Sequence, residues 1–170
     1  IGAANFVLNQ LSGRVGKPFD HSGSIARSGR LIKDLFDNLN NLDFFKQIPP
    51  KSTGAEWVHE EILPLLSAGK PEDLLRTFTE HIAFQIAGNL SQLKSKTVLV
   101  SGGGAYNTFL MNRIEELTDA RVVLPDPSIV EFKEALIFAL MGVLRLRNEN
   151  NVYASVTGAA RDHCSGIVYE

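Results

Sequence analysis

The feature that most constrains the fold is a β-branched run that ends abruptly in three consecutive glycines. Residues 97–100 (Thr-Val-Leu-Val) have the composition of a strand, and Ser101-Gly102-Gly103-Gly104 follows directly. Apolar residues at helical spacing resume between 110 and 117. The order is therefore strand, glycine turn, helix. Because helical patterns dominate the rest of the chain, we expect a helix-rich α/β fold with a small sheet.

The remaining pattern is mostly helical. Apolar residues recur at three- and four-residue intervals, which predicts helices over 6–13, 25–40 (a pair of short helices), 57–66, 71–93 and 129–147. A second strand is predicted at 121–124, where prolines close it, and a last edge strand at 167–169. The sequence contains neither an internal repeat nor a linker, so we expect residues 1–170 to form one compact unit.

Charge and hydropathy exclude several classes of function. The net charge is −2 and Lys and Arg form no run, which argues against nucleic acid as the main ligand. The longest apolar run, 135–144, is bounded by Glu134 and Arg145. It falls short of the roughly 20 residues of a membrane span, so it predicts a buried helix and no membrane partner.

The cysteine and histidine content points to a chain without a metal site. Cys164 is the single cysteine, which fits a reducing cytoplasm. The histidines at 21, 59, 81 and 163 are far apart, and none has metal-ligand spacing with another His or Cys. The chain opens at Ile1 without an initiator Met, and its first residues lack the pattern of a signal peptide. We therefore expect a fragment or a processed product.

The glycine turn is the strongest candidate for a binding site. Three glycines remove every Cβ where the backbone enters a helix, so a flat or anionic ligand can approach the main chain and the helix N-terminus. This predicts a nucleotide site over Gly102, Gly103, Gly104 and the nearby Asn107. The spacing matches neither the dinucleotide fingerprint nor a phosphate-binding loop ending in Gly-Lys-Ser/Thr. A tight turn that needs glycine for packing alone remains the alternative.

Two further positions are candidates for ligand contacts. Gly2 and Asn5 stand at a predicted helix start, where backbone N–H groups and the Asn5 amide suit a phosphate; an ordinary helix cap is the alternative. Glu134 precedes an apolar segment, 135–139, that should be buried. A carboxylate there needs a partner, which a sugar hydroxyl would supply. The alternative is a solvated pair with Lys133.

A series of short motifs resembles a known family in the order in which they occur. They are 1–5 (Ile-Gly-Ala-Ala-Asn), 28–29 (Ser-Gly), 49–54 (Pro-Pro-Lys-Ser-Thr-Gly), 101–107 (Ser-Gly-Gly-Gly-Ala-Tyr-Asn), 133–139 (Lys-Glu-Ala-Leu-Ile-Phe-Ala) and 155–159 (Ser-Val-Thr-Gly-Ala). The chain resembles the C-terminal half of the anhydro-N-acetylmuramic acid kinases. These motifs span nearly the whole sequence, and their shared order is more specific than any one of them.

The resemblance implies a fold and an activity. The family belongs to the actin-like ATPase and sugar kinase superfamily (ribonuclease H-like), whose members close two α/β lobes around ATP and a sugar. Residues 1–170 would be the C-terminal nucleotide- and sugar-binding lobe, without its N-terminal lobe. The family uses ATP, Mg²⁺ and water to open the 1,6-anhydro ring of anhydro-N-acetylmuramic acid and to phosphorylate O6. The product is N-acetylmuramic acid 6-phosphate, formed in the cytoplasm during peptidoglycan recycling, and a homodimer is one expected assembly.

The resemblance also assigns roles to residues. Gly102, Gly103, Gly104 and Asn107 would lie by the nucleoside, Gly2 and Asn5 near the phosphates, and Glu134 at the sugar. Lys51-Ser52-Thr53-Gly54 would be a further element of the nucleotide lobe.

The departures from the family pattern concern the chemistry. No segment resembles the family's N-terminal phosphate loop (Gly-Thr-Ser-x-Asp-Gly), and its catalytic Asp would fall immediately before Ile1. In the family this Asp heads an Asp-x-Gly-x-x-Asn motif, and Ala3 stands where that motif usually has a proline after its glycine. We therefore predict no catalytic residue in this chain and an inactive isolated lobe. The alternative, from another class, is a non-catalytic nucleotide-binding or interaction domain of the same superfamily.

Overall fold

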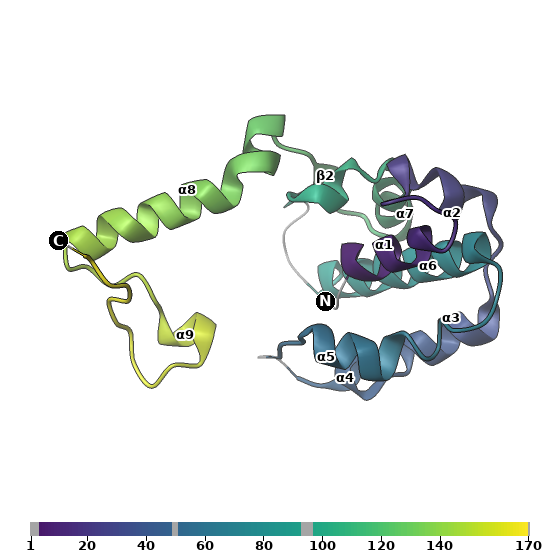
Figure 1. Ribbon diagram of the computed structural model, residues 1–170, viewed down its shortest axis with the longest axis horizontal. Coiled ribbons are helices and arrows are strands. Elements are labelled where there is room, and N and C mark those ends of the chain that lie inside the picture. Colours follow the sequence, from purple (N-terminus) through teal and green to yellow (C-terminus); the bar gives the residue numbers. More distant parts are fainter. Residues whose placement is uncertain (1–3, 49–50, 93–96, 170) are drawn as a thin grey trace. The chain divides into compact units, whose positions relative to one another are not determined.

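The computed structural model describes residues 4–48, 51–92 and 97–169, and the chain divides into two compact units, Ile1–Pro125 and Asp126–Glu170 (Figure 1). The first unit is built from helices and a small sheet, whereas the second consists of a long helix and an irregular tail. That residues 1–170 form one lobe of a larger kinase remains a prediction.

The first unit is organised around α6 (Pro71–Leu90), the longest of its described helices. Its start agrees with the sequence pattern, because Pro71 occupies the first turn and Glu72 and Asp73 complement the helix dipole. Four helices pack against it: α1 (Asn5–Gly13), α2 (Ser24–Ser28), α3 (Lys33–Asn40) and α7 (Thr108–Leu117). The predicted pair of short helices over 25–40 is thus confirmed.

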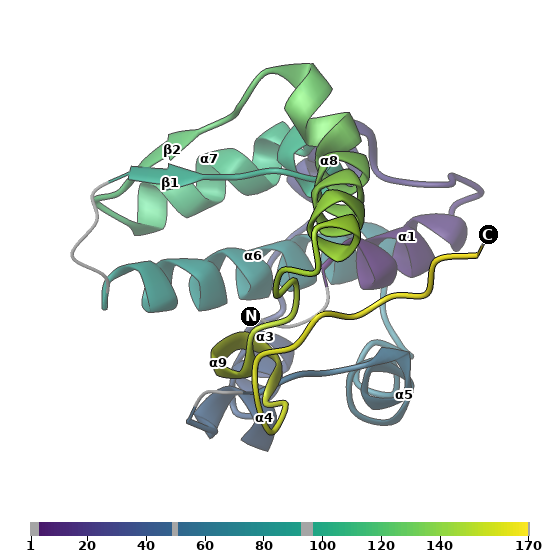
Figure 2. The same cartoon turned by 90° about the vertical axis from the view of Figure 1, so that its left-hand side faces the viewer.

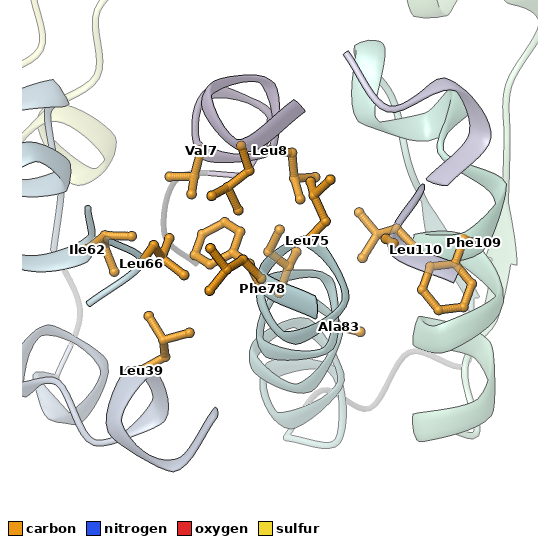
Figure 3. Packing of buried hydrophobic residues seen from close by; sticks show 14 of the residues in the cluster. Val7, Leu8, Leu39, Ile62, Leu66, Leu75, Phe78, Ala83, Phe109 and Leu110 are labelled. Atoms are coloured by element: carbon orange, nitrogen blue, oxygen red, sulfur yellow. The ribbon is translucent and has the colours of Figure 1, made fainter. Parts of the chain in front are cut away.

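The hydrophobic core surrounds α6 on several sides (Figure 3). Phe78 and Leu75 of α6 lie at its centre, with Leu8 of α1 and Leu110 of α7 on neighbouring sides. All four side chains are almost fully buried. Burying one such side chain contributes roughly 1.5–3 kcal/mol, so this cluster holds the surrounding segments in place.

The small sheet pairs β1 (Thr97–Leu99) with β2 (Arg121–Val123) in parallel (Figure 2). Thr97 lies opposite Arg121, and the ladder continues where the Val100 N–H donates to the Val123 carbonyl oxygen over 3.0 Å. The connection runs through η3 (Gly103–Tyr106), a 3₁₀ turn, and α7, which packs against β2. The predicted helix-rich α/β fold with a small sheet is confirmed.

Other elements differ from the sequence pattern. The helix predicted over 57–66 is α5 (Ala55–Trp57) continued by a wider π-type turn, η2 (Val58–Ile62). Three short elements were not predicted, because too few residues form them to give a periodic pattern of apolar residues. They are the helices α4 (Asp43–Lys46) and α9 (Ala154–Thr157) and the 3₁₀ turn η1 (His21–Gly23). The predicted end of α6 at residue 93 lies outside the described residues, and the helix ends at Leu90.

The predicted edge strand at 167–169 is wrong. Those residues are irregular, and the tail instead forms an isolated antiparallel bridge between Val152 and His163. The Ser165 N–H donates to Asn151 Oδ1 over 2.7 Å and extends this turn with a side chain. A strand requires a neighbouring ladder, and in the described part of the second unit only the bridge supplies backbone partners between extended segments.

The second unit carries α8 (Pro127–Leu146), which Asp126 caps by accepting the Ser128 N–H over 2.9 Å. The expectation that residues 135–139 are buried is wrong, because Leu136 is 67% exposed and Phe138 is 68% exposed. The tail that shares this unit is irregular and leaves the helix uncovered, and its own large apolar side chains are also exposed: Tyr153, Val156, Ile167, Val168 and Tyr169. Among the described helices, none has both the length and the apolar character needed to cross a bilayer.

Candidate functional site

A cavity of about 400 Å³ lies in the first unit between α1, the loop that precedes α2, and the glycine turn. It is lined by Asn5, Leu8, Asn9, Phe19, Asp20, His21, Ser22, Gly103, Tyr106 and Asn107. Asn5 from one predicted motif therefore meets Gly103 and Asn107 from a distant one. Such a volume suits part of a small-molecule ligand.

The glycine turn forms one wall of the cavity because of its backbone conformation. Gly102 has φ +88°, a value that side-chain-bearing residues rarely adopt, and it turns the chain out of the strand. A Cβ placed on Gly104 would lie 3.2 Å from Asn5 Oδ1, and one on Gly103 would lie 3.4 Å from Asn5 Nδ2. The Asn5 carboxamide therefore packs directly against the turn. The glycines serve close packing here and at the same time keep the Gly103 backbone open to the cavity.

Asn107 caps a helix, a structural role that was not predicted from the sequence. It is 8% exposed, and its Oδ1 accepts the Leu110 N–H over 3.0 Å, which caps α7. Gly23 lies against it so closely that a Cβ on this glycine would collide with Asn107 Oδ1 and with Phe109 Cβ. With Oδ1 committed to the helix, the amide Nδ2 group is the part of Asn107 that can serve a ligand.

Asp20 anchors the loop that forms the opposite wall. Its carboxylate accepts the backbone N–H groups of Ile25 over 2.8 Å and Ala26 over 2.9 Å, and the hydroxyl of Ser24 over 3.4 Å. A buried carboxylate requires such donors, and these three fix the start of α2. The sequence analysis missed this residue. The signal that could have found it is the segment Asp-His-Ser-Gly-Ser at residues 20–24, whose Asp, Ser and Gly residues favour turns and helix caps.

The same loop carries two aromatic side chains into the wall of the cavity. Phe19 is 54% exposed, and its ring centroid lies 6.2 Å from that of His21. Ser22 adopts φ +55°, and its carbonyl oxygen accepts the Thr108 hydroxyl over 3.2 Å, which ties the loop to the start of α7. The loop is thus held in place while Phe19 remains open to solvent.

The segment Lys51–Gly54 lies at a different hollow. The Lys51 ammonium donates to the Phe44 carbonyl oxygen over 2.8 Å and sits 4.8 Å from the centre of the Phe44 ring. The hollow has a volume of about 760 Å³, and its lining includes Ser52, Thr53 and Gly54 together with Glu56, Glu60 and Glu61. Three glutamate carboxylates in one hollow repel phosphate. The surroundings of residues 51–54 therefore do not favour a nucleotide contact.

Among the predicted residues that the structure describes, Gly102, Gly104 and Glu134 do not line the cavity. Glu134 lies on α8 in the second unit, where it is exposed, and its contact with a sugar stays a prediction. Gly2 lies outside the described residues. Within the described part of the chain, no three His, Cys, Asp or Glu side chains gather in a way that would hold a metal ion.

The structure belongs to the helix-rich α/β class, with a small parallel sheet whose first strand ends in a glycine turn at a cavity. Comparison with protein families narrows this class. The family model for anhydro-N-acetylmuramic acid kinase matches residues 1–170, and the chain belongs to that family.

Relatives in several bacteria support the assignment. The chain is similar to the anhydro-N-acetylmuramic acid kinase of Actinobacillus pleuropneumoniae serotype 7, with 36% identity over 90% of this chain and 44% of the relative. The kinase of Sulfurimonas denitrificans is 30% identical over 99% of this chain and 50% of its own length. The kinase of Variovorax paradoxus is 32% identical over 99% and 48%. The chain thus spans about half the length of the curated relatives that it matches.

Proposed function

We propose that this chain is the nucleotide- and sugar-binding part of an ATP-dependent kinase that acts on anhydro-N-acetylmuramic acid. The whole enzyme would open the 1,6-anhydro ring with water and phosphorylate O6, giving N-acetylmuramic acid 6-phosphate in peptidoglycan recycling. One observation carries the proposal: in a member of this family, Asn5 and the glycine turn meet at one cavity. The proposed location is the cytoplasm, where ATP is available, and homodimerisation stays a prediction.

The cavity offers ATP three groups. Gly103 presents backbone without a side chain to the cavity, and Gly102 and Gly104 flank it, so we propose that the nucleoside approaches the turn closely at Gly103. Asn5 is exposed at the start of α1, where its amide can donate to a phosphate oxygen. A phosphate contact by Gly2, which lies outside the described residues, is proposed from the family resemblance alone. Asn107 adds its amide Nδ2 from the start of α7. These groups bind and orient the nucleotide without reacting.

Mg²⁺ enters the proposal through the nucleotide. In proteins this ion is usually held by one or two carboxylates together with substrate phosphates. Among the described residues, the cavity contains one carboxylate, Asp20, and both of its oxygens accept hydrogen bonds from Ser24, Ile25 and Ala26. The described wall therefore does not fit a protein-held Mg²⁺, and no step is assigned to the ion here.

The sugar and the chemistry require the rest of the protein. Glu134 is proposed to hydrogen-bond sugar hydroxyls, which a carboxylate does as an acceptor. The general base is expected immediately before Ile1, and the phosphate loop in the N-terminal lobe. Because this chain covers about half of its relatives, the N-terminal lobe is its proposed partner, and the chain alone is proposed to be inactive.

A coupled assay for ADP release tests the proposal. The protein from the complete open reading frame and this chain would each receive ATP, Mg²⁺ and 1,6-anhydro-N-acetylmuramic acid. Activity in the complete protein alone is the expected result. Activity of this chain by itself would contradict the partner requirement. A complete protein that is folded and binds ATP but is inactive would favour the non-catalytic nucleotide-binding domain.

A matched pair of glycine substitutions tests the nucleotide site itself. Gly103→Val in the complete protein should weaken ATP binding at least tenfold while leaving the far-UV circular dichroism unchanged, because the added side chain occupies the wall of the cavity. Gly88→Val is the control, since a Cβ on Gly88 of α6 meets no atom within 4 Å. Equal ATP affinity in both variants, measured by calorimetry, would defeat the assignment.

A further inference from the structure

Phe19 is an apolar ring left open at the wall of a cavity. It is 54% exposed, although most large apolar side chains around α6 are buried. Its contact with the His21 ring is tilted at 34° with centroids 6.2 Å apart, which leaves much of the phenyl face uncovered. No motif in the sequence analysis included this residue. An exposed aromatic face beside a cavity is the kind of surface on which a flat ligand stacks.

The loop that carries Phe19 is fixed before any ligand arrives. The next residue, Asp20, is held by the donors at the start of α2, and the Ser22 carbonyl oxygen is held by Thr108. Gly23 of the same loop packs directly against Asn107, which also lines the cavity. A wall fixed in this way loses little conformational freedom when it binds, so its aromatic face is preorganised.

The surroundings of Phe19 suit a base better than a phosphate. The buried Leu8 adds apolar surface to the cavity, and the Asp20 carboxylate, the one acidic group among the described lining residues, stands directly next to Phe19 in the chain. Apolar surface and negative charge both disfavour phosphate oxygens at this wall. Phosphates would instead lie toward the Asn5 amide and the glycine turn.

We propose that Phe19 is a specificity-determining residue that stacks on the base of the bound nucleotide. This inference rests on the proposed function of the cavity as a nucleotide site. Stacking of a base on an aromatic side chain tolerates different bases, because every base has a π face. Phe19 therefore selects ligands that carry an aromatic base over ligands that carry phosphates alone.

Calorimetry on the complete protein tests the stacking role with three substitutions. Phe19→Ala should weaken ATP binding about tenfold and leave the binding of inorganic triphosphate unchanged. Phe19→Leu, which keeps apolar volume but loses the ring, should resemble Phe19→Ala, whereas Phe19→Trp should bind ATP like the unsubstituted protein. Phe84→Ala is the control, since Phe84 is similarly exposed, at 47%, and does not line the cavity.

The outcomes separate this inference from the proposed function. If the unsubstituted protein binds ATP and folded Phe19→Ala binds it equally well, the stacking role is overturned and the nucleotide site stands. If Phe19→Ala weakens the binding of ATP and of triphosphate to the same degree, Phe19 supports the loop and does not stack on the base. That result would also overturn the stacking role. If the folded, unsubstituted protein binds no ATP, the proposed function fails, and this inference fails with it.

Discussion

Helices α6 and α8 have the same length and similar beginnings but opposite surroundings. Each contains 20 residues and carries a proline in its first turn. Ten residues of α6 are buried, including Phe78 and His81, whereas Val130 is the single buried residue on α8. The exposed apolar residues of α8 are Ile129, Phe132, Leu136, Ile137, Phe138, Leu140, Val143 and Leu146.

The difference shows that helix formation and helix burial have separate causes. A capping residue and a run of good helix formers define α8 locally, and they require no other part of the chain. Burial requires a second surface, which α6 finds in α1, α2, α3 and α7. An apolar surface as extensive as that of α8 is typical of regions that contact another surface. The described part of the second unit does not cover this surface.

The largest effect is expected for truncation in the centre of α6. Phe78 is 1% exposed, and Phe78→Ala should lower the free energy of unfolding of this chain by about 3–5 kcal/mol, because it removes buried apolar surface and leaves a cavity. Urea denaturation followed by circular dichroism measures this. A loss below about 1 kcal/mol would mean that the core around α6 repacks freely, and the comparison with α8 would lose its basis.

A pH-dependent loss of stability is expected from His81, which lies on the buried side of α6. Burial lowers the pKa of His81 from 6.5 to about 4. Its Nδ1 donates to Asn40 Oδ1 over 2.8 Å, a bond that both the neutral and the protonated ring can make, so burial is the cause of the lowered pKa. Between these two pH values the unfolded chain binds the proton and the folded chain does not. Stability should therefore be complete above about pH 6.5 and fall by about 3 kcal/mol as the pH drops to 4.

The control for this pH effect is a variant series. His81→Gln should lose the part of the pH dependence that falls between 6.5 and 4, while His59→Gln, at an exposed position, should keep it. The measurement is urea denaturation at several pH values, with the difference between the unsubstituted chain and His81→Gln isolating the histidine from the carboxylates. Parallel curves for these two proteins would show that the pKa of His81 is the same in the folded and unfolded chains, which contradicts the prediction.

Local patterns predicted the parts of the molecule that local physics determines. The strand, the glycine turn and the following helix were predictable because β-branched residues, glycines and helical spacing act over a few residues. The start of α6 at Pro71 was predictable for the same reason. The edge strand at 167–169 failed because its pattern carries no information on whether a neighbouring strand exists.

The candidate site was predictable residue by residue but not as an arrangement. Sequence motifs singled out Asn5 separately from Gly103 and Asn107, and the packing of α1 and α7 against α6 accompanies their meeting at one cavity. Phe19 and Asp20 lie in a loop without helical or strand periodicity, so their position at the wall depends on long-range contacts such as Thr108 with Ser22. Such contacts leave no periodic signal in the sequence.

The smallest effect is expected for the same truncation on α8. Phe138 is 68% exposed, so Phe138→Ala removes little buried surface and should change the free energy of unfolding of this chain by less than about 0.5 kcal/mol. It should also lower the binding of a hydrophobic dye, because the exposed ring contributes to an apolar surface. Urea denaturation beside Phe78→Ala provides the direct comparison. A loss for Phe138→Ala that approaches the loss for Phe78→Ala would show that α8 is covered in solution, and the contrast between the two helices would no longer hold.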